Sequence, residues 1–184
     1  QDRRGDRGQS SGRTAGPPAG DRDEVAGGER SGGGGFRGGT RARNRAIFGG
    51  AGTDTLTGSN PANVFTIQGP DQGIFNTDWA RFSKFERLAC YDTGAGLSSN
   101  DRFVFGQGVD FAGRIHGQGG TDWLDYSAYG AAVAVDLTAG SATGVAGGAL
   151  GRVMDVQNVI GSALNALLRG NALSNDLRGG AGND

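Results

Sequence analysis

Residues 49–57 read GGAGTDTLT, and nine-residue units of the same design recur along the chain. Glycine opens each unit, the sixth position is Asp or Asn in all of them except one, and the eighth position is large and apolar. A fixed period of this kind indicates stacked units, because no single unit can bury its own apolar residue. The further copies lie at residues 58–66, 96–104, 117–125, 161–169, 170–178 and, incomplete, 179–184.

The chemistry of each position predicts what the unit does. Glycines permit positive φ, so the first six residues can reverse the chain in a tight turn. The last three residues are then extended, and their apolar side chain points inward. A carboxylate at the sixth position lies beside turn carbonyls, and such oxygen sets suit calcium. The sixth residues are Asp54, Asn63, Asp101, Asp122, Ala166, Asn175 and Asp184, and the expected inward residues are Leu56, Phe65, Phe103, Leu124, Leu168 and Leu177.

Composition indicates an all-β, turn-rich protein. Glycine supplies 38 of 184 residues, and the acids are 16 Asp against 3 Glu, which favours turns over helix interiors. Short apolar runs such as residues 133–137 alternate with period two, as half-buried strands do. Residues 78–88 have helix-like apolar spacing, but their surroundings favour an irregular or strand-like segment. The repeat register likewise argues against a helix at residues 161–168.

The chain divides at a change of composition. Residues 1–46 are low in complexity and carry ten Arg and six acids, and too few apolar residues lie there to offset the entropy of ordering. We expect a disordered tail over 1–46 and a repeat array over 47–184. The Arg-Gly-Asp tripeptide at 4–6 and the Arg/Gly-rich run at 32–43 are compatible with chance in such a tail, so nucleic-acid binding is not favoured. No apolar stretch is long enough to predict a transmembrane segment.

The residues of this array resemble the RTX, or hemolysin-type, calcium-binding repeats, whose nonapeptide is GGxGxDxUx. Residues 49–57 and 117–125 match best, and the segments between repeats resemble those of large bacterial secreted and surface proteins. The resemblance covers about 47–184 and implies a right-handed parallel β-roll, or β-solenoid, with two nonapeptides per coil and irregular longer coils. Ala166 and Leu164 depart from the pattern, and Asn63 and Asn175 keep an oxygen but lose the charge. Since the last unit stops at its sixth residue, we expect an array truncated at its C-terminal end.

Calcium ions would lie between successive turns on one side of such a roll. Following the turns along the chain pairs Asp101 with Asp122 and Asp54 with Asp71, and both pairs rank above Ala166 with Asp184, which has one carboxylate. The residues expected to hold calcium are Asp54, Asp71, Asp101, Asp122, Asp184, Gly50, Gly52, Gly119, Gly180 and Gly182.

These observations predict a calcium-binding structural module of a secreted or cell-surface bacterial protein, in contact with neighbouring repeats of its parent protein. The alternative is a calcium-independent solenoid adhesin or scaffold that presents a face to a surface or glycan ligand. An enzyme is not expected, because His116 and Cys90 are the only residues of their kinds and no catalytic motif accompanies them. Core burial is the favoured interpretation for Cys90, and Trp123 and Tyr126 are expected to cap the core.

Overall fold

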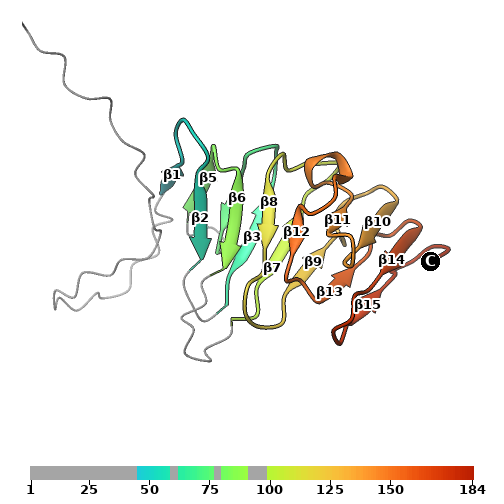
Figure 1. The fold of residues 1–184 in the computed structure, drawn as a ribbon. Coiled ribbons are helices and arrows are strands. Elements are labelled where there is room, and N and C mark those ends of the chain that lie inside the picture. The colour runs from blue at the N-terminus through green and yellow to red at the C-terminus, as the bar shows by residue number, and fades with distance from the viewer. Residues whose placement is uncertain (1–44, 59–61, 77–79, 91–98) are drawn as a thin grey trace, which may run out of the picture.

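The computed structural model describes residues 45–58, 62–76, 80–90 and 99–184. The expected disordered tail therefore lies almost wholly outside the described residues. Within the described ranges the protein is all-β, and its helical segment is the short 3₁₀ turn η1 (Ala146–Gly148). Figure 1 shows the strands stacked side by side along one direction. The described part of the chain contains no helix that is both long and apolar enough to cross a membrane.

One layer is an eight-stranded sheet in the order β1-β5-β4-β3-β7-β9-β13-β15. From β3 onward its neighbours are parallel, and each comes from a later part of the chain. Its strands are β1 (Ala46–Phe48), β3 (Val64–Ile67), β4 (Gln72–Phe75), β5 (Ala80–Ser83), β7 (Arg102–Phe105), β9 (Trp123–Asp125), β13 (Asn158–Ile160) and β15 (Leu177–Arg178).

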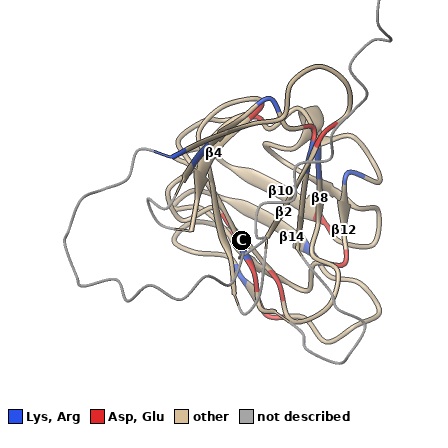
Figure 2. Ribbon diagram, turned by 90° about the vertical axis from the view of Figure 1, so that its left-hand side faces the viewer, with Lys and Arg blue, Asp and Glu red and all other residues tan. Residues whose placement is uncertain are grey.

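Two smaller sheets form the other layer. The order β12-β8-β6-β2 gives a parallel four-stranded sheet, and β11-β10-β14 gives a three-stranded one. Figure 2 shows the layers end-on, with β4 on one side and β2, β8, β12 and β14 on the other. The strands are β2 (Thr55–Gly58), β6 (Arg87–Cys90), β8 (Arg114–His116), β10 (Val133–Asp136), β11 (Ser141–Ala142), β12 (Val153–Met154) and β14 (Ala166–Arg169).

The chain passes repeatedly from the smaller sheets to the large one. Strand β2 is followed by β3, β6 by β7, β8 by β9, β12 by β13 and β14 by β15. Because parallel neighbours keep their register, equivalent residues of successive units stack in rows. Leu56 aligns with Leu88 and then Ile115 in one layer. The two layers bury one continuous core.

The predicted inward residues occupy these rows. Leu56, Phe65, Phe103 and Leu124 are fully buried, and Phe65 stacks on Phe103 with ring centroids 5.1 Å apart. Burying such a side chain stabilises the fold by about 1.5–3 kcal/mol. Leu168 is only partly buried.

The prediction for Leu177 is wrong, since it is 38% exposed. Leu177 does keep its place in the row, opposite Val159. Strand β15, however, has a neighbour on one side only, so no further row covers the leucine.

Antiparallel strands interrupt the repeat in two places. Strands β3, β4 and β5 form an antiparallel meander inside the large sheet, and β10 pairs with β11 in the same way. The strand-like interpretation of residues 78–88 holds where they are described, because β5 and β6 lie there. Residues 161–168 likewise lead into β14 and form no helix.

Candidate metal centre

The sixth residues of several units meet at one edge of the large sheet. Asn63, Asp101 and Asp122 immediately precede β3, β7 and β9, which are adjacent and parallel. Parallel strands begin at the same edge, so these side chains stack one above another. Gln157, just before β13, continues the series. We call this set of four residues the edge ladder.

Three side chains of the edge ladder, those of Asp101, Asp122 and Gln157, hold the backbone of the turn before them. Asp101 Oδ1 accepts a hydrogen bond from the Asn63 backbone N–H at 2.6 Å, and Asp122 Oδ1 accepts one from the Asp101 N–H at 2.8 Å. Gln157 Oε1 accepts one from the Asp122 N–H at 2.8 Å. These bonds join successive turns. The uncharged side-chain amide of Gln157 accepts such a bond just as the carboxylates of Asp101 and Asp122 do.

In the units whose first glycine is described, that glycine makes room for the sixth side chain. A Cβ on Gly117 would lie 2.5 Å from Asp122 Oδ2 and 2.2 Å from the Asp155 carbonyl oxygen. Contacts below 3.0 Å between such atoms force a shift in the structure. The same crowding by the sixth side chain occurs at Gly49, Gly58, Gly161, Gly170 and Gly179. The recurring glycine is therefore a steric requirement of the stacked turns.

The carboxylates of Asp101 and Asp122 are both fully buried but differ in their partners. Asp101 is satisfied, because Oδ1 accepts from the backbone N–H and Nδ2 of Asn63 and Oδ2 accepts from Ser99 Oγ. Asp122 uses only Oδ1, and its Oδ2 has no hydrogen-bond partner among the described residues. An unsatisfied buried carboxylate oxygen is costly in a folded protein.

The electrostatics of Asp122 follow from this position. Burial raises the pKa of Asp122 to about 7 from its ordinary 3.8, and the negative charges of Asp101 and Asp155 add to the rise. The hydrogen bond from the Asp101 backbone N–H acts in the opposite direction. Without a compensating cation, the ionised form of Asp122 is therefore disfavoured near neutral pH.

A third group joins the two carboxylates. The Cys90 thiol lies at the end of β6, in the opposite layer, and one ligand atom from each of Cys90, Asp101 and Asp122 lies within 4.8 Å of the others. Burial, with the nearby Asp101 carboxylate, raises the pKa of this thiol well above its usual range. Cys90 is buried, as expected, but the sequence offers no signal that places it beside the aspartates.

The opposite edge differs from expectation. Asp54 precedes β2, and its neighbour is Glu86, whose Oε2 accepts the Asp54 backbone N–H at 2.8 Å. The expected adjacency of Asp54 and Asp71 is wrong. Asp71 lies in the turn between β3 and β4, and β4 and β5 stand between β3 and β1 in the sheet. The inserted meander moves Asp71 out of the stack.

The C-terminal turns stack as the repeat predicts. Asp184 Oδ1 accepts the Ala166 backbone N–H at 2.8 Å, and Asn165 Oδ1 accepts the Asn183 N–H at 3.1 Å. Asp184 is exposed and faces an alanine rather than a second carboxylate. This pair of turns is therefore the weaker candidate.

The glycines proposed for calcium binding fall into two groups. Gly50, Gly52 and Gly180 have φ of 114°, 123° and 110°, a region that only glycine adopts easily. In the unit that begins at residue 117, Gly120 rather than the expected Gly119 has this conformation, with φ of 117°. A Cβ on Gly120 would lie 1.9 Å from the Ser99 carbonyl oxygen, so the turns approach closely there.

Gly182 lies against the backbone of the turn before it. A Cβ on Gly182 would lie 2.9 Å from the Asn165 backbone nitrogen and 3.1 Å from the Leu164 carbonyl oxygen. Gly182 is thus placed by close packing of the stacked turns, whether or not an ion is present.

Other chemistry-bearing residues lie outside this centre. His116 Nε2 pairs with Asp155 Oδ2 at 2.6 Å in an exposed position, and neither residue belongs to the group of Cys90, Asp101 and Asp122. Tyr126 is fully buried, and Arg178 covers the Trp123 ring at 4.9 Å.

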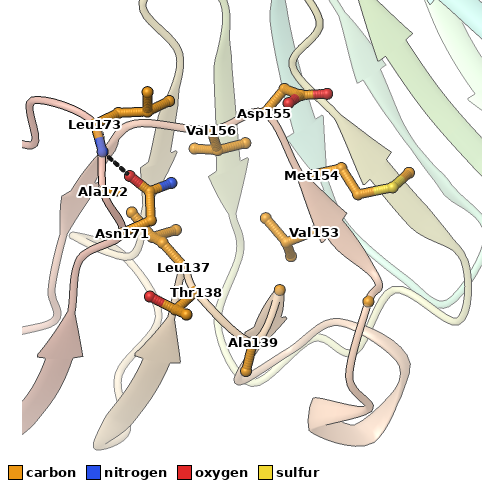
Figure 3. Close-up of a pocket in the computed structure, with 12 residues that line it drawn as sticks. Leu137, Thr138, Ala139, Val153, Met154, Asp155, Val156, Asn171, Ala172 and Leu173 are labelled. Atoms are coloured by element: carbon orange, nitrogen blue, oxygen red, sulfur yellow. Dashed lines mark hydrogen bonds between the residues drawn. The ribbon is translucent and has the colours of Figure 1, made fainter.

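A groove of about 470 Å³ is lined by the segments that follow β10 and β14 and by residues in and around β12 (Figure 3). Leu137, Val153 and Val156 contribute to its apolar lining, and Asp155 is its charged residue. That composition offers no set of groups arranged for catalysis.

Comparison of the chain with protein-family models gives no match, and comparisons with curated proteins and with solved structures give none either. The case for a metal centre therefore rests on the residues themselves. The unpartnered, buried Asp122 Oδ2 beside a second carboxylate suits a hard divalent cation.

Proposed function

We propose that the chain is a calcium-binding structural repeat module of a secreted or cell-surface protein, folded as a right-handed parallel β-roll of the RTX type. The alternation of strands between two layers and the stacked glycine turns support this proposal. The observation that carries it is the Asp122 carboxylate, buried with one oxygen lacking a partner beside Asp101.

Calcium would be held by Asp122 and Asp101 together with carbonyl oxygens of the glycine turns. A bound divalent ion would supply positive charge where two carboxylates are buried, and would favour the ionised form of Asp122. Asp54 with Glu86 forms a second candidate, on the opposite edge. The edge ladder would position the carboxylates by holding each turn against the next.

Such a site would couple folding to the ion. Binding to the folded chain alone stabilises it by RT ln(1 + [Ca²⁺]/Kd). With a Kd of about 10⁻⁴ M, in the range of extracellular modules, calcium at about 1 mM would contribute about 1.4 kcal/mol per site. A module of this kind would gain stability after export to a calcium-rich medium.

The test is a calorimetric titration of calcium into the wild type and Asp122→Asn, with Asp136→Asn as control. Asp136 is an aspartate of β10 that pairs with Arg169 at the surface, in a different sheet from the strands that carry the edge ladder. We expect Asp122→Asn to weaken binding about tenfold or more and the control to bind as the wild type does. Equal binding by all three proteins would remove Asp122 from the site.

The alternative function is a calcium-independent scaffold or adhesin. One observation favours it: the edge ladder is completed by the uncharged Asn63 and Gln157, whose hydrogen bonds need no ion. Circular dichroism separates the two proposals. The calcium module gains thermal stability when calcium replaces a chelator, whereas the scaffold unfolds at the same temperature in both.

A further inference from the structure

We infer that the buried cluster of Cys90, Asp101 and Asp122 is also a site for a thiophilic divalent ion such as zinc, which competes with calcium there. The inference rests on the proposed calcium function, because it concerns the same carboxylates. The proposed site includes a sulfur ligand, which the nonapeptide pattern does not contain. That ligand would allow the site to bind a second class of metal ion.

The register of the strands brings the thiol to the carboxylates. Cys90 pairs with Gly58, and its neighbour Ala89 pairs with His116, which directly precedes Gly117. Gly117 is the glycine against which Asp122 Oδ2 packs. Gly58 thus stands beside Cys90 in one neighbouring strand, and Gly117 directly follows the other, β8. Neither glycine has a side chain that would keep the thiol and the carboxylate apart.

The geometry is close to that of a metal site. One ligand atom from each of the three residues lies within 4.8 Å of the others. Two ligands of a tetrahedral zinc ion, at metal distances of about 2.0–2.3 Å, are about 3.5 Å apart. Closing the triangle therefore needs movements of about 1 Å. Three protein ligands would leave the fourth position of such an ion to water.

The donor set determines which ion prefers the site. Calcium takes oxygen ligands and gains little from sulfur, whereas thiolate sulfur favours zinc and cadmium. The unpartnered Asp122 Oδ2 offers the oxygen ligand that either ion can use. When a thiophilic ion binds, the metal–sulfur bond replaces the S–H bond of Cys90, and the proton passes to the buffer. Calcium binding leaves that proton in place.

The chain itself makes the test specific. Cys90 is its only cysteine, so a sulfur-to-metal charge-transfer band in the ultraviolet can arise only from this residue. Full-length, reduced protein is titrated with cadmium ions, and the band is followed to saturation. We expect one equivalent of cadmium to saturate it, zinc to displace cadmium, and millimolar calcium to shift the titration to higher cadmium concentration.

Two variants separate this inference from the calcium function. Cys90→Ser should lose the band and bind zinc at least about 100-fold more weakly, more than the loss of a supporting residue causes. Its calcium affinity should stay within about threefold of the wild type, because calcium does not use the thiol. Asp122→Asn should weaken both ions. Circular dichroism checks that each variant is folded, and the wild-type titration needs no variant.

The outcomes are distinct. If calcium binds and cadmium gives no band in the wild type, the thiophilic site is refuted and the calcium function stands. If the band appears and calcium neither binds nor competes, the proposed calcium function fails while the metal site remains. A band that Asp122→Asn leaves unchanged would also overturn the inference, since the thiol would then bind cadmium without the cluster.

Discussion

Replacing Asp122 by asparagine should have opposite effects on stability in the absence and presence of calcium. Without an ion, burial raises the pKa of Asp122 to about 7, above its ordinary 3.8. The folded state then binds a proton more tightly than the unfolded state, so this group favours folding at low pH. That contribution is lost as pH rises from about 4 to about 7. Above pH 7 the folded protein carries an uncompensated buried charge.

The magnitude follows from the size of the shift. About three pKa units at 1.36 kcal/mol each set a ceiling of about 4 kcal/mol, and relaxation and water penetration around the buried charge lower it to about 2 kcal/mol. Asparagine removes the charge and keeps the oxygen that accepts the Asp101 N–H. In chelator at pH 8, Asp122→Asn should therefore be about 1–2 kcal/mol more stable than the wild type. At pH 5, part-way through the range in which this contribution is lost, the difference should be smaller.

Calcium should reverse this order. At a calcium concentration 100 times Kd, the wild type gains about 2.7 kcal/mol that the variant lacks. Urea unfolding followed by tryptophan fluorescence, at pH 5 and pH 8 with chelator or 10 mM calcium chloride, measures all four free energies of unfolding. Asp136→Asn controls for the loss of one surface carboxylate. A variant that is less stable than the wild type in chelator at pH 8 would refute the reasoning, because the Asp122 charge would then be stabilised without an ion.

Three further pairs of substitutions test the architecture. Gly117→Ala should lower stability by about 3 kcal/mol, because the added Cβ would meet a backbone carbonyl of the next turn at 2.2 Å. In the control Gly108→Ala the added Cβ meets no atom within 4 Å, so the cost should be about 1 kcal/mol, for the positive φ alone. Equal losses of stability in thermal unfolding would exclude the steric explanation. Phe103→Ala should lower the free energy of urea unfolding by about 3–5 kcal/mol, because Phe103 is fully buried. Phe48 is 60% exposed, so Phe48→Ala should lower it by less than about 1 kcal/mol. The reverse order would disprove the stacked core. Glu86→Ala should lower stability by about 1 kcal/mol, because the Asp54 backbone N–H loses its acceptor. Glu86→Gln keeps an acceptor for that N–H and should leave stability nearly unchanged. A similar loss of stability in both variants would show that the charge of Glu86 matters and the hydrogen bond does not.

Local regularities explain which expectations hold. The inward positions of Leu56, Phe65, Phe103 and Leu124 follow from a nine-residue phase that turn geometry imposes within each unit. Leu177 belongs to the same phase but is exposed, because burial also requires a neighbouring row. The position of a residue within the nine-residue unit is thus set locally, whereas its burial depends on strands from other parts of the chain.

The sequence by itself determined the all-β class, the glycine turns and the place of the sixth carboxylate, since steric rules within nine residues are sufficient for these. Only the tertiary structure decided which turns are neighbours. A meander between β3 and β5 separates Asp71 from Asp54 and puts Glu86 beside it. Strand register across the two layers brings Cys90 to Asp101 and Asp122. Such contacts depend on the stacking order of whole strands, which no local pattern encodes.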